Sequence, residues 1–373
     1  MLLGIDGQAH YSTAQFGRKW TQTTDYCTWT IATEGRWSAN PCVKRVATAG
    51  SIPPGYISRG GGLTQSGVWT PTASGVCGFA FKTLELARHI GGNPGSAGSE
   101  GGLIAIMEGS SAHVIVNVNA DGSISAYRMP TSGAMDLLAT SAPVLADNTW
   151  AYIECKWTID DATGSVKVRV NELEVLSYAG PTQSTFGLEP FLGIWTSVRL
   201  LGMRSDGVNL LTCWMNDFYL LDQGGSGAQL RDFLGDVRVQ TILPNGAGVS
   251  AAWTPSAGAN YAAVDEVPAD DDTTYVSTNT AATRDSHTYQ DIPTTAVVLG
   301  FQTCHLARRE TAGSAILKPT VRSGGTTHDG NGQSVGSDTA YTYALQPYDT
   351  NPVTSAQATA AEINAAEFGT LYV

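Results

Sequence analysis

Charged side chains are scarce in this chain. Lys, Arg, Asp and Glu together make up 14% of the 373 residues, whereas about a quarter is usual for a soluble domain. The charges present are unbalanced, with 21 basic against 33 acidic residues and a net charge of -12. Binding to nucleic acid depends on Lys and Arg side chains that neutralise phosphates. We therefore expect no nucleic-acid partner.

Long apolar runs are absent as well. No stretch approaches the roughly 20 apolar residues that cross a bilayer. Residues 1–7, Met-Leu-Leu-Gly-Ile-Asp-Gly, lack the basic and apolar regions of a secretory signal. We therefore expect no membrane insertion, and synthesis in the cytoplasm of the cell that makes the protein.

Sequence motifs for metals and cofactors are missing. The six cysteines contain no C-x-x-C pair, and the six histidines contain no His-x-His or His-x-x-x-His pair, which are common signs of a zinc site. The Gly-rich segments 60–62 and 91–95 lack the Lys-Ser/Thr of a phosphate loop. Asp270-Asp271-Asp272 offers oxygen ligands for calcium without the spacing of a calcium loop, and we interpret it as a solvated loop. The sequence predicts no metal and no cofactor.

Three cysteines occur inside apolar, strand-like patterns, at positions 77, 155 and 213. Cysteine without a partner thiol behaves as a small buried hydrophobe, so we predict buried thiols there. A disulfide between Cys27 and Cys42 is the less favoured alternative.

Catalytic constellations are also missing. Hydrolysis of a glycan needs two carboxylates that flank the scissile bond, and no Glu-x-Asp-x-x-Glu strand occurs. Glu172 and Glu174 fall on one face of a predicted strand, where we interpret them as a solvated hairpin edge. The one Gly-x-Ser-x-Gly pattern, at residues 332–336, follows the polar, glycine-containing segment 328–331 rather than an apolar strand, so we do not interpret it as the nucleophile turn of a hydrolase. We predict that the protein has no catalytic residues and is not an enzyme.

The clearest positive signals are two β-hairpins. Residues 113–118 and 123–128 flank an Asp-Gly turn, which suits the positive φ angles of a tight hairpin. Residues 152–159 and 166–170 alternate strictly between apolar and polar side chains around a second turn. A period of two predicts strands with one face on a core.

Further strands are predicted on both sides of a Gly/Ser-rich segment at 223–227. Before it lie segments 75–82, 103–107, 191–196 and 211–221, and after it 296–307, 314–322 and 339–346; residues 255–296 are polar and rich in turns. The one predicted helix covers residues 355–368. We expect a flexible joint at 223–227 that separates a β-sandwich at 1–222 from a smaller β domain at 223–373.

Two segments resemble concanavalin A-like, or laminin-G-like, sandwiches. Residues 150–157 and 164–171 are similar to the back-to-back hairpin of these domains, and residues 216–222 to a closing strand. The resemblance implies an all-β chain with a concanavalin A-like antiparallel sandwich at its start. This fold class agrees with the strand patterns.

The order of later pieces resembles structural proteins of tailed bacteriophages. These pieces are residues 233–239, 253–255, 260–266, 270–276 and 365–369. The resemblance implies a non-enzymatic virion protein of the tail or a fibre, made in the cytoplasm of the bacterial host. Its expected partners are copies of itself and other virion proteins, in a homo-oligomer for which a trimer is the first expectation.

Aromatic side chains leave a second interpretation open. Sugar rings stack on exposed aromatic rings, and the chain has nine Trp. Trp157 and Trp195 fit core patterns, whereas Tyr56 and Trp69 lie in loop-like stretches. We single out Tyr56 and Trp69 as candidate interface or glycan contacts, because exposed aromatics anchor interfaces. The alternative function is a host glycan-binding adhesin, a lectin-like receptor-binding module.

Overall fold

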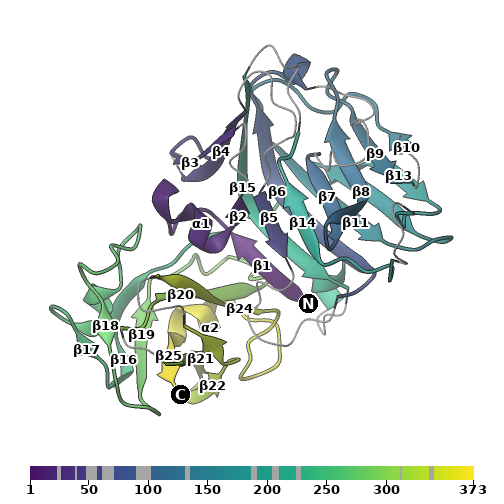
Figure 1. The fold of residues 1–373 in the computed structure, drawn as a ribbon. Coiled ribbons are helices and arrows are strands. Elements are labelled where there is room, and N and C mark those ends of the chain that lie inside the picture. The colour runs from purple at the N-terminus through teal and green to yellow at the C-terminus, as the bar shows by residue number, and fades with distance from the viewer. Residues whose placement is uncertain are drawn as a thin grey trace.

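The computed structural model describes residues 1–22, 27–37, 40–47, 57–60, 71–89, 102–130, 135–185, 191–203, 210–223, 228–310, 313–335 and 340–373. Nearly all regular elements in these ranges are antiparallel β-strands. The expected fold class, an all-β chain with an antiparallel sandwich followed by a smaller β domain, is confirmed (Figure 1).

The sandwich consists of two large sheets. In spatial order, the first sheet contains β13 (Leu173–Ala179), β12 (Ser165–Val170), β11 (Ala151–Thr158), β6 (Ser74–Thr83), β15 (Leu211–Asp222), β4 (Cys42–Ala47) and β3 (Cys27–Ala32), and β1 (Leu2–Asp6) also pairs with β15. The second sheet contains β10 (Asp136–Thr140), β9 (Ile124–Arg128), β8 (Ser111–Val118), β7 (Ile104–Glu108), β14 (Ser197–Leu200), β5 (Ile57–Gly60) and β2 (Thr21–Gln22).

Both predicted hairpins form and supply the core between these sheets. They are β8–β9 and β11–β12. The predicted core positions Trp157 and Trp195 are fully buried and meet edge to face at 5.1 Å between ring centroids. Gly75 lies directly under Trp157, where a Cβ atom would overlap the indole ring. The packing of this large ring therefore requires glycine on the neighbouring strand.

The prediction that the cysteines at positions 77, 155 and 213 are buried thiols is confirmed. Cys77, Cys155 and Cys213 are buried in the sandwich. Cys27 and Cys42 form no disulfide, because they lie at opposite ends of the β3–β4 hairpin, where Cys27 pairs with Ala47 and Cys42 with Ala32.

The smaller β domain contains the remaining sheets. A six-stranded sheet has the order β16 (Pro244–Ala251), β19 (Arg284–Tyr289), β25 (Glu367–Tyr372), β21 (Ile316–Ser323) and β22 (Thr326–Asp329), with β23 (Gln333–Ser334) also paired to β21. Two further pairs are β17 (Thr254–Pro255) with β18 (Val276–Ser277), and β20 (Phe301–Ala307) with β24 (Thr342–Tyr348).

Helices are short throughout the described residues. They are α1 (Phe16–Lys19), α2 (Ala360–Ala365), and the 3-10 turns η1 (Thr13–Gln15), η3 (Leu86–Arg88), η4 (Ala228–Arg231) and η5 (Asn260–Ala263). None of the helices in the described residues is long and apolar enough to cross a membrane.

The helix predicted at 355–368 is wrong in extent. The Thr359 hydroxyl accepts a hydrogen bond from the backbone of Glu362, and the Glu362 carboxylate accepts one from the backbone of Thr359, so this capping box begins α2. Ala366 turns extended, and Phe368 then pairs with His287 in β19. Strand pairing and burial of Phe368 override the helical propensity of this segment.

Three other strand boundaries differ from expectation. Residues 191–196 are not a strand, because the Glu108 carboxylate accepts the backbone N–H groups of Leu192 and Ile194. Strand β20 ends at Ala307 as predicted but begins at Phe301 rather than at 296, after a turn in which the Ala296 N–H donates to the Pro293 carbonyl. The polar region 255–296 contains β19, which sequence periodicity did not reveal.

The predicted joint at 223–227 lies largely outside the described residues, and the domain boundary there stays a prediction.

Candidate ligand cavity between the sandwich and the smaller domain

A cavity of about 1150 Å³ lies where the smaller domain meets the sandwich. Its walls come from β1 and α1 of the sandwich, from the connecting segment 230–243, from the loop 269–279, and from strands β19, β20 and β25. Ligand sites usually have volumes of about 300–1,000 Å³. The space is therefore large enough for a ligand of several rings.

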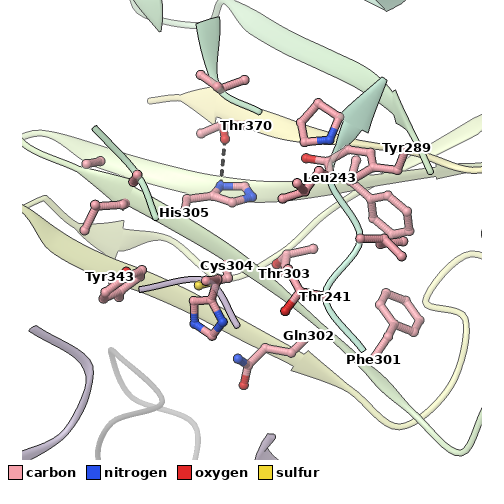
Figure 2. A pocket seen from close by; sticks show the side chains of 18 of the residues that line it. Thr241, Leu243, Tyr289, Phe301, Gln302, Thr303, Cys304, His305, Tyr343 and Thr370 are labelled. Carbon is pink, nitrogen blue, oxygen red and sulfur yellow. Dashed lines mark hydrogen bonds between the residues drawn. The ribbon is translucent and has the colours of Figure 1, made fainter. Parts of the chain in front are cut away.

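The β20–β24 pair divides this space as a septum with two different faces (Figure 2). Phe301 and Phe368 belong to the core cluster of the smaller domain, whereas Tyr343 and Leu345 belong to the sandwich core. Gln302 reaches the sandwich, where its amide contacts the backbone of Ile5. Alternation along β20 therefore directs Phe301, Thr303 and His305 inward and the intervening residues toward the sandwich.

The six-stranded sheet supplies the opposite side. Asp285, His287 and Tyr289 alternate along β19, and Thr370 and Phe368 of β25 stand opposite the first two. All five line the cavity. We call these five residues, together with Phe301, Thr303 and His305, the inner wall.

His305 is the central polar group of the inner wall. Its Nδ1 atom lies 2.7 Å from the Thr370 hydroxyl, and the ring is partly open to the cavity (Figure 2). Burial, with the nearby His287 as a smaller cause, lowers the pKa of His305 to about 4. The ring is therefore neutral at pH 7 and retains both a donor and an acceptor nitrogen.

His287 and Asp285 are more deeply buried. Burial lowers the pKa of His287, and burial raises the pKa of Asp285, opposed by a hydrogen bond from the Asn260 amide. That amide nitrogen lies 2.9 and 3.0 Å from the two carboxylate oxygens. The His287 Nε2 is 3.6 Å from the carboxylate, too far for a good hydrogen bond. The Asn260 amide, rather than a cation, thus holds this carboxylate.

The sandwich side of the cavity ends at a buried ionic cluster. The Asp6 carboxylate accepts hydrogen bonds from Trp20 at 2.6 Å and Tyr11 at 2.8 Å, and Lys19 lies 3.4 Å away. The Lys19 ammonium is also 2.9 Å from His10 Nε2. Among the six cysteines, only Cys304 is exposed, and it lines the same space.

The triple-aspartate loop closes one side of the cavity. Asp271 forms a two-pronged ion pair with Arg18 of α1, at 2.5 and 2.8 Å. Asp272 accepts hydrogen bonds from Arg308 at 2.7 Å and from the Tyr341 hydroxyl at 2.7 Å. The loop is solvated as interpreted, with the Asp272 side chain 63% exposed, but both aspartates are also ion-paired, which the sequence did not reveal. They join the loop to the sandwich and to the ends of the septum.

Two buried carboxylates lie beneath the connecting segment, outside the inner wall. Burial raises the pKa of Glu154 and of Asp217, a property that often marks catalytic acids. Here Glu154 accepts hydrogen bonds from the Tyr219 hydroxyl at 2.5 Å and the Gly235 N–H at 2.9 Å. Asp217 accepts the Val239 N–H at 2.9 Å. Both groups hold the connecting segment against the sandwich.

The other predicted site residues are dispersed. Tyr56 and Trp69 lie outside the described residues. Glu174 forms an exposed ion pair with Lys167, and Glu172 sits in the turn before β13 with a positive φ of 70°, so the two do not share a strand face as expected. In the described part of the chain, no group of three or more His, Cys, Asp or Glu side chains could hold a metal ion.

The residues that meet at the inner wall were not found from the sequence. His287 and His305 are 18 positions apart and lie on strands of different sheets. The one local signal was that Phe301, Thr303 and His305 alternate along a strand and so share a face. Because these three residues are of different chemical types, the pattern is typical of an ordinary surface strand and does not indicate a site.

No protein-family model matches the chain, and no curated protein matches it. Solved structures with a similar sandwich include the cellulose-induced protein Cip1, at 13% identity over 55% of this chain and 91% of that chain, with a TM-score of 0.36. Carbohydrate-binding module CBM66 from Bacillus subtilis is 13% identical over 54% and 95%, with a TM-score of 0.29. An alginate lyase from Chlorella virus is 12% identical over 56% and 96%, with a TM-score of 0.37. Binding proteins and enzymes both occur among these neighbours.

Proposed function

We propose that this protein is a non-catalytic glycan-binding protein that holds a saccharide in the cavity between its two β domains. The observation that carries the proposal is the composition of the inner wall. The partly exposed rings of Tyr289 and Phe301 both pack against the buried Phe368 ring. They stand beside the hydroxyl and imidazole groups of Thr370 and His305. A saccharide has apolar C–H faces and hydroxyl edges, and this wall offers matching partners for both.

The neutral state of His305 strengthens the proposal. An uncharged imidazole can exchange hydrogen bonds with a sugar hydroxyl as donor or acceptor. Its Nδ1 is already oriented by Thr370, so little side-chain freedom is lost when a ligand binds. Such preorganisation favours affinity.

Cys304 provides a direct test of where a glycan binds. It is the one exposed cysteine and lines the cavity, so alkylation by iodoacetamide should be selective for it. A glycan found on an array should slow this alkylation several-fold, measured by mass spectrometry of the Cys304 peptide. The result against the proposal is an array with no binding at all. Binding that leaves the alkylation rate unchanged would exclude the sandwich face of the septum, to which Cys304 points, and would leave the inner wall to be tested by substitution.

A cavity-filling variant supplies the matched comparison. Thr241 lines the cavity, and Thr241→Trp should abolish saccharide binding by occupying the space. Thr326 is exposed on β22, on the other side of the sheet order from β19, and Thr326→Trp should bind normally. Equal affinity of both variants would contradict the proposed site.

The non-catalytic part of the proposal is tested separately. Glu154 and Asp217, the buried carboxylates with raised pKa, are bonded to the connecting segment rather than directed at the inner wall. We therefore expect no release of reducing ends, and no unsaturated product, from any glycan that the protein binds. Turnover that disappears in Glu154→Gln would make the protein an enzyme.

A virion structural subunit remains the second candidate. The observation that favours it is the open edge of the sandwich, where β10 and β13 end the two sheets next to one another (Figure 1). Leu137 and Leu173 on these strands are 58% and 71% exposed. Unprotected edges with apolar side chains tend to associate. The protein would then be a tail or fibre component, made in the host cytoplasm and assembled from copies of itself.

Light scattering tests this candidate. We expect a homo-oligomer, with a trimer as the first expectation, that dissociates in Leu137→Arg. An exposed polar substitution elsewhere, Thr326→Arg, should leave the assembly intact. A monodisperse monomer at micromolar concentration would exclude the structural-subunit function through this edge.

A further inference from the structure

The cavity has a marked excess of negative charge. Its lining contains nine carboxyl side chains but only four from Lys and Arg. Two of the three histidines in the lining, His287 and His305, add no compensating charge at pH 7, because burial lowers the pKa of both. Arg18 and Arg36, outside the lining, pair with Asp271 and Asp236. An excess of acidic groups remains after these pairs are counted, so a ligand in this space meets a negative potential.

Most of the basic groups are already engaged. The Lys19 ammonium lies beside Asp6 and His10, and Arg308 bonds to Asp272. Arg238 lies over the Trp37 ring, with 5.4 Å from its guanidinium carbon to the ring centroid. Arg309 is the exception, since its Nε atom has no partner among the described residues.

The inner wall itself is the least favourable place for an anion. It contains Asp285, whose carboxylate is held by the Asn260 amide, and it contains no Lys or Arg. Two like charges repel strongly when both are removed from water, because the effective dielectric constant is low there. A ligand carboxylate or sulfate at the inner wall would gain no cation and would face this group.

We infer that the cavity selects saccharides without acidic groups and excludes uronic-acid and sulfated glycans. This inference rests on the proposed glycan-binding function and adds the ligand class to it. It stands on the charges of the lining residues and on the Asn260-held carboxylate of the inner wall. A neutral hexose and its uronic acid differ only at one carbon, so the two ligands isolate the effect of charge.

Calorimetry with matched oligosaccharides tests the inference. Neutral galactose or glucose oligomers should bind at least 10-fold more tightly than galacturonate or glucuronate oligomers of the same length and linkage. The difference should shrink as sodium chloride is raised, because salt screens repulsion. Equal or tighter binding of the uronate oligomers would overturn the inference while leaving the glycan-binding function intact. If neither series binds, nor any other glycan, the proposed function fails and the inference fails with it.

Substitutions then locate the source of the selection. Asp285→Asn keeps the size of the side chain and should bring the ratio of neutral-oligomer affinity to uronate-oligomer affinity several-fold closer to one. The control Asp161→Asn, at an exposed turn of the sandwich, should leave this ratio unchanged. Circular dichroism checks that both variants fold. Asp270→Asn, in the loop at the cavity rim, gives a second test if Asp285→Asn does not fold. If instead Arg309→Gln abolishes a measurable affinity for uronates, the cavity binds acidic sugars through that side chain and the inference is wrong.

Discussion

The two β domains of this protein are built differently although both are antiparallel. The sandwich core joins side chains from both of its large sheets and includes four fully or nearly buried Trp, at positions 20, 29, 157 and 195. The core cluster of the smaller domain has six buried residues, Val321, Tyr348, Ala358, Ile363, Ala366 and Phe368. The smaller domain therefore relies more on polar contacts and on the sandwich beside it.

The difference in core packing indicates that the sandwich contributes most of the stability, whereas the region around the smaller domain contributes the ligand cavity. A densely packed interior leaves few voids larger than a water molecule, whereas the smaller domain borders a cavity of about 1150 Å³. Side chains that face such a space lose packing contacts on one side. The sandwich thus provides a rigid support, and the less densely packed region next to it provides the space for a ligand.

Truncation of the sandwich core should have the largest effect. Trp157→Ala removes a fully buried ring in contact with Trp195, and the expected loss is about 3–5 kcal/mol of unfolding free energy. Phe301→Ala, in the half-buried septum, should cost at most half as much. Urea unfolding measures both. A larger loss for Phe301→Ala would contradict the contrast between the domains.

Removal of Glu154 tests the attachment between the domains. Glu154→Ala leaves the Tyr219 hydroxyl and the Gly235 N–H without their acceptor, and each such group costs about 1–3 kcal/mol when buried. Glu154→Gln keeps an acceptor oxygen and should lose less. Proteolysis should also cut the connecting segment faster in Glu154→Ala. Unchanged cleavage would show that other contacts hold the segment.

Acidification should weaken both domains through histidine. Burial lowers the folded-state pKa of His89 to about 3 and of His305 to about 4, whereas an unfolded chain titrates near 6.5. The unfolded state thus binds more protons below pH 6.5, so stability is complete above that pH and falls as pH drops toward 4. For His305 the loss at pH 5 is about 2 kcal/mol.

Thermal melts from pH 7 to pH 5 check this dependence. His89→Gln should flatten the profile of the sandwich, and His305→Gln that of the smaller domain. Buried Glu154, Asp217 and Asp285, whose pKa values are raised, act in the opposite direction, so the comparison is between each variant and the wild type. Profiles of both variants that match the wild type would show that neither ring is buried in its neutral form.

The ion pair between Arg18 and Asp271 should have the smallest effect. Its two side chains are 27% and 34% exposed, and exposed pairs contribute about 0.2–1 kcal/mol. A double-mutant cycle with Arg18→Ala and Asp271→Ala should give a coupling energy in this range that decreases with salt. A coupling above 2 kcal/mol would indicate that the loop contributes more to domain docking than its exposure implies.

The sequence alone determined the all-β class and the two hairpins of the sandwich. Alternation in residues 152–159 and 166–170 and the Asp-Gly turn at 121–122 are local signals, and they predicted the β11–β12 and β8–β9 hairpins correctly. Local signals suffice here because a period of two and a tight turn each depend on residues that are near one another in the chain.

Only the tertiary structure decided the candidate site. Strand β19 is polar along its length and became a strand through pairing with β16 and β25. His305 reaches Thr370, and Arg18 reaches Asp271, across 65 and 253 positions of the chain. The cavity is the space that side chains from the sandwich, the connecting segment and the smaller domain leave unoccupied where these parts of the chain meet. No local pattern encodes that outcome, because it depends on the docking of one domain against the other.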